Sequence, residues 1–424
     1  MRDSAELSRR GGPTASGAGS ASSDAGPSAS NAEPTARGLD AITRAVRAGL
    51  ESDPLTGAVV PPIHLSSTFA FRGFGEKRGY DYTRSGNPTR DLLGQALAEL
   101  EGGAGGVVTA TGMAAVTLVG YLLPAGARIV APHDCYGGTY RLFAAWQRRG
   151  ELAVEFVDFA DEAAVGRALA SPTALLWIET PSNPLLRITD IARFAALGRE
   201  RGALVVVDNT FLSPLWQRPI ELGADLVVHS TTKYLNGHSD VVGGAVVART
   251  KELHEQLTWW ANCLGLTGAP FDSYMTLRGL RTLSARLEQH ARNAAALAEW
   301  LQEQPGVERV YYPGLPSHPG HEVARCQQRG FGAVVTLELA GGLEAVRAFS
   351  SGLKCFSLAE SLGGVESLIA HPATMTHAGM DPEARRRAGL VDGLIRLSVG
   401  IEALEDLRAA LDAALERARR ATRA

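Results

Sequence analysis

Short apolar runs alternate with helical patterns through the middle of the chain. Runs of strand length occur at residues 128–131, 154–157, 174–179, 203–208, 225–229 and 245–248. Between them, apolar residues recur at helical spacing, for example at 137–149, 161–170 and 189–201. Strands that alternate with helices predict a mostly parallel sheet with helices on both faces. Ligands of such sheets bind at the carboxyl ends of the strands, so the residues that follow each strand are the candidates for chemistry.

The pattern changes after about residue 290. A long helical stretch at about 276–303 leads to strand candidates at 308–312, 333–338 and 394–398, and a helical run closes the chain at about 404–421. This order favours a second, smaller α+β domain.

The N-terminal part of the chain has no comparable pattern. Residues 1–36 are mostly Ser, Ala and Gly and cannot bury enough apolar surface to offset their ordering entropy, so we expect a disordered tail. Residues 37–86 lack a repeating pattern and favour an extended arm. The predicted division is a tail at 1–36, an arm at 37–86, a large domain at 87–290 and a small domain at 291–424.

Composition and charge exclude several classes of function. The 424 residues include 42 Lys and Arg against 45 Asp and Glu, and this balance argues against a nucleic-acid binder. No apolar run approaches the roughly 20 residues of a membrane span. The histidines show no metal-binding spacing, and the cysteines (135, 263, 326 and 355) form no short-spaced pair. We therefore expect a cytoplasmic protein that holds no metal and contacts neither nucleic acid nor membrane.

Two polar segments follow predicted strands and carry the main chemical signal. Asp208 ends one strand, and the next is followed by Ser230, Thr232 and Lys233. A lysine there suits a covalent aldimine with pyridoxal 5′-phosphate, whose phosphate the two hydroxyl groups could bind. Asp208 could keep the ring nitrogen protonated, which makes the ring an electron sink. The alternative, a surface lysine and a helix-capping aspartate, is disfavoured by the apolar strand that leads into each segment.

Further candidates follow other strands. Gly112 and Met113 lie at a strand-to-helix turn, where backbone N–H groups can approach a phosphate. Tyr136 is placed to stack on a flat ring, although a core tyrosine at a turn is the alternative. In the arm, Tyr82 and Arg84 are two residues apart and could grip a phosphate, or could belong to a solvated loop.

Arg396 lies within an otherwise apolar strand at 394–398. A charge inside such a strand is costly unless it is paired. A substrate carboxylate held by two hydrogen bonds would supply the partner, and an internal ion pair with a protein carboxylate is the alternative.

Together these motifs resemble the Cys/Met-metabolism branch of the fold-type I pyridoxal-phosphate enzymes, from about residue 38 to the C-terminus. The resemblance rests on the residues at 82–89, 134–138, 179–184, 208–210 and 230–234. It implies a mostly parallel seven-stranded sheet flanked by helices, a smaller α+β C-terminal domain and an extended N-terminal arm. It also implies a homotetramer built from two active dimers.

The same resemblance implies roles for single residues. Lys233 would bond the cofactor and shuttle protons, Asp208 would hold the ring nitrogen, and Tyr136 would stack on the ring. The phosphate and its surroundings would be bound by Gly112, Met113, Thr210, Ser230 and Thr232, and by Tyr82 and Arg84 of the neighbouring subunit. Asn183 would contact the ring oxygen of the cofactor. Arg396 and Ser361 would bind the α-carboxylate of the substrate. Glu360 would lie near the amino group of the incoming amino acid, and Asn183 and Tyr82 would also contact the substrate.

The run at 359–368 resembles the members of the family that act at the γ-carbon. This implies γ-replacement, in which O-succinyl-L-homoserine and L-cysteine give L-cystathionine and succinate, a transsulfuration step of methionine biosynthesis. Some members carry a second Arg where this chain has Ser85, so Arg141 is the candidate for the succinyl carboxylate, and the choice between succinyl and acetyl esters stays open.

Other activities remain alternatives. A lyase that cleaves cystathionine or methionine by elimination, or a sulfhydrylase that uses sulfide, would share the first half of the reaction. A non-catalytic relative is disfavoured because Lys233 and Asp208 are both present. A nicotinamide oxidoreductase is disfavoured because no G-x-G-x-x-G opens the first βα unit.

Overall fold

The computed structural model describes residues 38–423. The predicted disordered tail at 1–36 therefore lies outside the described residues. From Asp40 onward the chain forms one compact unit that contains two sheets.

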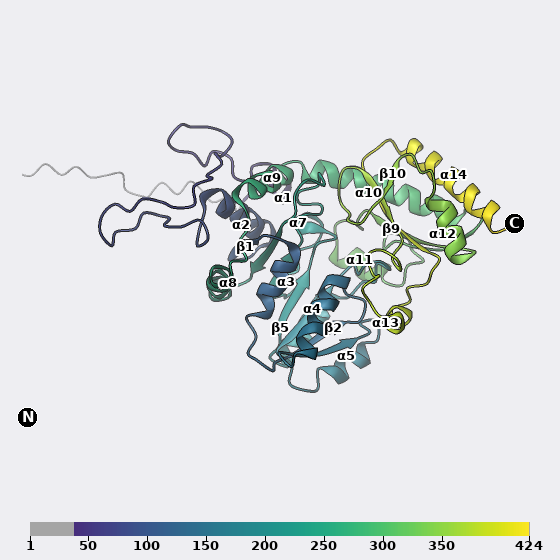
Figure 1. Cartoon of the computed structure of the whole chain (residues 1–424), viewed down its shortest axis with the longest axis horizontal. Coiled ribbons are helices and arrows are strands. Elements are labelled where there is room, and N and C mark those ends of the chain that lie inside the picture. Colours follow the sequence, from purple (N-terminus) through teal and green to yellow (C-terminus); the bar gives the residue numbers. More distant parts are fainter. Residues whose placement is uncertain (1–37, 424) are drawn as a thin grey trace, which may run out of the picture. The chain divides into compact units, whose positions relative to one another are not determined.

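The first sheet has seven strands in the order β1-β7-β6-β5-β4-β2-β3. Figure 1 labels β1, β2 and β5 of this sheet. Its strands are β1 (Gly105–Thr109), β2 (Arg128–Pro132), β3 (Ala153–Val157), β4 (Leu175–Glu179), β5 (Leu204–Asp208), β6 (Leu226–His229) and β7 (Gly244–Ala248). All neighbours pair in parallel except β7, which is antiparallel to β1 and β6. The predicted mostly parallel seven-stranded sheet is thus confirmed.

Helices cover both faces of this sheet, which explains why its central strands are apolar throughout. The helices are α2 (Pro88–Glu101), α3 (Gly112–Gly120), α4 (Gly137–Arg148), α5 (Glu162–Ala168), α6 (Ile191–Glu200), α7 (Ser213–Trp216) and α8 (Lys251–Leu264). Apolar side chains of α3, α4 and α8 share one core with Val206 and Val228. On the other face, α5 and α6 pack against Val205 and Val207, and α2 packs against Val227.

The second sheet has five strands in the order β10-β11-β12-β9-β8. These are β8 (Val307–Tyr311), β9 (Val334–Leu339), β10 (Phe356–Leu358), β11 (Ser367–Ala370) and β12 (Leu394–Ser398), and only β10 and β11 pair in parallel. The accompanying helices are α10 (Leu283–Gln302), α11 (His321–Gln327), α12 (Gly342–Ser350), α13 (Pro382–Arg387) and α14 (Leu404–Ala421), whereas α9 (Pro270–Leu280) packs against α2. This is the expected smaller α+β part of the chain.

Three details differ from the sequence pattern. The helical stretch at 276–303 is two helices, α9 and α10, interrupted at residues 281–282. The arm opens with a helix, α1 (Ala41–Val46), which Asp40 caps and which buries Ala41 and Ala45. Because α10 runs continuously through residue 291, the domain boundaries remain predictions.

Candidate active site

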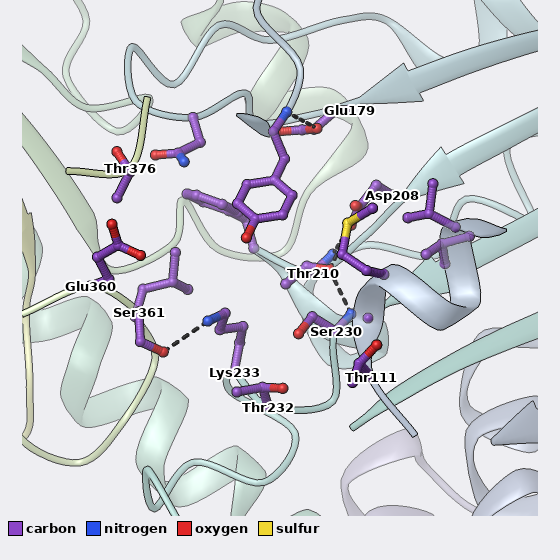
Figure 2. A pocket seen from close by; sticks show the side chains of 18 of the residues that line it. Thr111, Glu179, Asp208, Thr210, Ser230, Thr232, Lys233, Glu360, Ser361 and Thr376 are labelled. Atoms are coloured by element: carbon purple, nitrogen blue, oxygen red, sulfur yellow. Dashed lines mark hydrogen bonds between the residues drawn. The ribbon is translucent and has the colours of Figure 1, made fainter. Parts of the chain in front are cut away.

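A cavity of about 540 Å³ lies where the strand ends of the first sheet meet loops of the second (Figure 2). It brings together all the predicted site residues except the two in the arm. Its lining includes Gly112, Met113, Tyr136, Arg141, Asn183, Asp208, Thr210, Ser230, Thr232, Lys233, Glu360, Ser361 and Arg396.

Lys233 follows β6 and points into this cavity. Its Nζ atom donates a hydrogen bond of 2.8 Å to Oγ of Ser361 (Figure 2). Burial, together with the positive charge of Arg396, lowers the pKa of Lys233 to about 8. About a tenth of this amine is therefore neutral at pH 7, and this neutral form can act as a nucleophile or a base.

Asp208 ends β5, and its carboxylate is fixed by Thr210. Its Oδ1 atom accepts hydrogen bonds from the backbone N–H of Thr210 at 3.0 Å and from the Thr210 hydroxyl at 2.5 Å. The Thr210 hydroxyl in turn accepts from the backbone N–H of Ser230 at 2.9 Å. Burial raises the pKa of Asp208, while the bonds from Thr210 oppose that rise. A cationic partner in the cavity would favour the ionised form.

Glu179 ends β4 and is the register partner of Asp208. Its Oε2 atom accepts a hydrogen bond of 2.8 Å from the backbone N–H of Tyr136 (Figure 2). Burial and the nearby charge of Asp208 raise the pKa of Glu179 well above its usual value. The two neighbouring carboxyl groups therefore both have pKa values raised by burial.

A candidate anion-binding site lies at the start of α3. Thr111 caps this helix by accepting a hydrogen bond of 2.9 Å from the backbone N–H of Ala114. The first N–H groups of a helix have no partner inside the helix, so those of Gly112 and Met113 can bind an anion. A Cβ atom at Gly112 would lie 2.8 Å from Cβ of Ser230, so only glycine allows this close approach.

The hydroxyl of Thr232 already forms two hydrogen bonds within the protein. It donates to the carbonyl of Gly243 at 3.2 Å and accepts from the N–H of Gly243 at 3.0 Å. To bind a phosphate, Thr232 would have to redirect its donor while it keeps the bond that it accepts.

Arg396 on β12 is fully buried at the floor of the cavity. Nη1 donates to Oδ1 of Asn183 at 3.0 Å, and Nη2 donates to the carbonyl of Ser361 at 2.6 Å. Nε has no partner, and no carboxylate of the described residues lies within 4.0 Å. Burial lowers the pKa of Arg396 to about 10, still well above neutrality. The alternative of an internal ion pair is therefore wrong for residues 38–423.

Ser361 contacts both cationic side chains from an unusual backbone conformation. Its φ angle is +94°, in a region that non-glycine residues rarely occupy. This turn presents the hydroxyl to Lys233 and the carbonyl to Arg396. Strain of this kind is concentrated at functional sites.

The tyrosine ring predicted to stack on a cofactor lies at the cavity wall. Tyr136 immediately precedes α4, and burial raises the pKa of its hydroxyl. A Cβ atom at Gly138 would lie 2.5 Å from the Tyr136 ring, so this glycine makes room for the ring. One turn further along the helix, Arg141 lines the cavity and forms no ion pair with the described residues.

The two arm residues do not line the cavity of their own chain. Arg84 donates to Oδ1 of Asn262 at 3.0 Å, and its guanidinium carbon lies 5.4 Å from the centre of the Tyr82 ring. Their contact with a neighbouring subunit remains a prediction.

Sequence reasoning missed part of the lining. Thr111, Glu179, Met375 and Thr376 also face the cavity. Glu179 is the first residue of the motif at 179–184, and Thr111 caps the helix that begins at the predicted turn residue Gly112. Met375 and Thr376 belong to a loop after β11, and no local pattern linked that loop to the first sheet.

The described residues show neither a metal site nor a membrane segment. Between residues 38 and 423, no cluster of three or more His, Cys, Asp or Glu side chains could hold a metal ion. Within the same range, every helix is too short or too polar to cross a bilayer.

Comparisons with known proteins bear on this site. The family model described as Cys/Met metabolism PLP-dependent enzyme matches residues 42–416. The cystathionine gamma-synthase of Escherichia coli (strain K12) is 58% identical over 371 residues, 87% of this chain and 96% of that protein. The cystathionine beta-lyase of Coxiella burnetii is 51% identical over 375 residues, 88% of this chain and 97% of that protein. A similar solved structure is that of cystathionine gamma synthase from Xanthomonas oryzae pv. oryzae in complex with aminoacrylate and cysteine. Its TM-score to this chain is 0.89 at 62% sequence identity, and the match covers 90% of this chain and 99% of that chain.

Proposed function

Because the chain belongs to the Cys/Met-metabolism family of pyridoxal-phosphate-dependent enzymes, we propose that it catalyses γ-replacement on O-succinyl-L-homoserine. L-cysteine is the thiol, and L-cystathionine and succinate are the products. The relatives named cystathionine gamma-synthase, at 58% and 62% identity, support this choice. The observation that carries it is Arg396, a buried cation without an internal carboxylate that lies beside a lysine of lowered pKa.

The residues of the cavity fit pyridoxal phosphate. Lys233 offers an amine for the aldehyde, and Asp208 offers a buried carboxyl group for the ring nitrogen. The N-terminus of α3 offers unpaired N–H groups for the phosphate, and the ring of Tyr136 lines the same space. When bound, the cofactor withdraws electrons from the α-carbon of the amino acid.

The protein's own groups then position the ester and move its protons. Arg396 binds the α-carboxylate, since its planar guanidinium presents paired donors to a carboxylate. Nζ of Lys233 removes the proton from Cα and returns a proton after the thiol has added. A proton is then lost from Cβ, which breaks the bond between Cγ and the ester oxygen and releases succinate. The thiol of cysteine gives up its proton as its sulfur forms the new bond at Cγ, and protons return to Cβ and Cα. Arg141 meets the distal carboxylate of the succinyl group, and Glu360 lies near the incoming amino group.

The N-terminal arm presents Tyr82 and Arg84 away from the cavity of its own chain. Tyr82 and Arg84 lie outside the cavity of their own chain, and the Tyr82 side chain is 47% exposed. We propose that they reach the cofactor phosphate of a neighbouring subunit, in a homotetramer of two active dimers. Four free cysteines support a reducing, cytoplasmic location.

A comparison of initial rates tests the proposed function. Purified, cofactor-loaded enzyme is given O-succinyl-L-homoserine with L-cysteine, and in parallel cystathionine alone. We expect cystathionine formation from the first mixture to exceed cysteine and 2-oxobutyrate release from the second by at least tenfold. The reverse ratio would make the protein a γ-lyase, the second candidate, which the cystathionine gamma-lyase of Dictyostelium discoideum, 45% identical over 376 residues, favours. The Lys233→Ala variant should lose both activities. Retained turnover of the ester would show that Lys233 is not the catalytic base.

A further inference from the structure

A buried pair of ionisable side chains lies next to the site without lining the cavity. Glu101, the last residue of α2, accepts a contact of 2.6 Å at Oε1 from Nε2 of His229, and both side chains are 0% exposed. The same Oε1 accepts a hydrogen bond of 2.8 Å from Nδ2 of Asn209. Glu101 thus holds the residue after Asp208 and the residue before Ser230 at the same time.

The pair occupies the sheet face opposite Asp208. Asp208 is the register partner of Val228, and Val228 shares a core with Val206 and the helices on that face. Val227 instead packs in the core that includes α2. Side chains alternate along a strand, so His229 lies on the face of Val227 and reaches Glu101 there.

This arrangement is costly in free energy. A carboxylate at the C-terminal end of a helix faces the negative end of the helix dipole. In addition, Oε2 of Glu101 and Nδ1 of His229 are buried without partners among the described residues. Leaving a buried polar atom unpaired costs free energy. Neither side chain enters the cavity, so substrate or cofactor contact does not account for the pair.

We propose that Glu101 and His229 are positioning residues for Asp208: Glu101 binds both Asn209 and His229, fixes the ends of β5 and β6 against each other, and so holds the Asp208 carboxylate in its place in the cavity. The proposal deepens the proposed function, since it takes Asp208 as the partner of the cofactor ring.

Two routes connect the pair to the Asp208 carboxylate. One is covalent: Ser230 follows His229 and donates its N–H to the Thr210 hydroxyl, which donates to Asp208. The other is electrostatic, because a positive charge on His229 would lower the pKa of Asp208 and oppose the effect of burial.

Other charged groups nearby do not replace this role. Glu179 faces Asp208 from β4, and a negative charge there would act in the opposite direction. Arg218 approaches the end of α2, but it donates to the carbonyl of Leu100 at 2.9 Å and forms an ion pair with Glu221.

The test uses the Glu101→Gln variant of the holoenzyme, which keeps the shape and an acceptor oxygen but removes the charge. The readout is the pH titration of the cofactor's visible absorption, which does not depend on the ester or thiol that the enzyme prefers. We expect the midpoint to rise by about 0.5 unit or more, because a less protonated ring nitrogen repels the proton on the Lys233 nitrogen less strongly. We also expect kcat to fall about tenfold or more while KM for the ester stays within about twofold, since Arg396 is untouched.

Matched variants separate charge from shape. Glu99→Gln alters an exposed carboxylate on the same helix and should leave the spectrum unchanged. Glu101→Asp keeps the carboxyl group, so the midpoint of the pH titration should lie close to that of the wild type. His229→Gln should reproduce the shift of Glu101→Gln, and the double variant should add little to either. An unshifted midpoint in a folded Glu101→Gln holoenzyme would overturn the proposal.

Discussion

Nζ of Lys233 lies 2.8 Å from Oγ of Ser361, a contact that joins a loop of the first sheet to a loop of the second. The carbonyl of the same serine binds Arg396. One residue therefore sets the separation between the candidate base and the candidate anchor for the substrate carboxylate. The active site depends on how the two sheets pack, and not on either sheet alone.

The lowered pKa of Lys233 predicts a pH-dependent stability of the cofactor-free enzyme. The pKa of Lys233 is about 8 in the folded chain, against an ordinary lysine value of 10.5. Between these values the unfolded chain binds more protons, so the free energy of unfolding should rise with pH through this window. Lys233→Met should abolish about 2 kcal/mol of the rise between pH 7 and pH 10.

Urea denaturation of the cofactor-free wild type and variant at both pH values provides the measurement. Lys251→Met, at an exposed position on α8, is the matched control and should leave the rise intact. Parallel stability curves for wild type and Lys233→Met would show that Lys233 is not the titrating group.

Arg396→Lys should impair substrate binding more than the chemical step. Lysine keeps the charge, but it cannot present the planar pair of donors or keep the bonds to Asn183 and Ser361 together. We expect KM for O-succinyl-L-homoserine to rise about 10- to 100-fold. Steady-state kinetics measure this change, and Arg309→Lys on β8 is the surface control. An unchanged KM would place the substrate carboxylate elsewhere.

Arg141 is expected to distinguish succinyl from acetyl esters. Its guanidinium is exposed at the cavity, so its charge is worth about 1 kcal/mol to a distal carboxylate. Arg141→Leu should therefore lower kcat/KM for the succinyl ester about fivefold and leave the acetyl ester within about twofold. Arg148→Leu, near the end of the same helix, serves as the control. An equal loss for both esters would remove Arg141 from the recognition of the acyl group.

Arg84→Ala tests whether the arm completes a neighbouring site. Loss of a cation at the cofactor phosphate should lower cofactor retention after dialysis, whereas Arg72→Ala in the same arm should not. Retention is measured from the visible absorption, and the oligomeric state by sedimentation. Unchanged retention with an intact oligomer would show that the arm does not reach the cofactor.

Much of the first sheet was predictable because its strands are buried on both faces. Runs such as 203–208 and 225–229 lie within one residue of β5 and β6. The antiparallel direction of β7 has no local signature, since a buried strand has the same composition in either direction. The short strand β10 was missed because only Phe356 of its three residues is buried.

The candidate site was predictable where chemistry coincides with a strand end. Asp208, Ser230 and Lys233 have that signal, and the structure brings them into one cavity. Glu101 and His229 could not be paired from sequence, because their contact depends on α2 packing behind β6. Thr376 reaches the cavity only through the packing of the second sheet on the first.

The central claim is that a thiol intercepts the substrate after the acyl group has left the γ-carbon. The most direct measurement is a titration of L-cysteine at fixed, saturating O-succinyl-L-homoserine, with cystathionine and 2-oxobutyrate quantified together. We predict that cystathionine rises at the expense of 2-oxobutyrate while the release of succinate matches their sum at every concentration. Formation of 2-oxobutyrate that cysteine does not suppress, without cystathionine, would contradict γ-replacement.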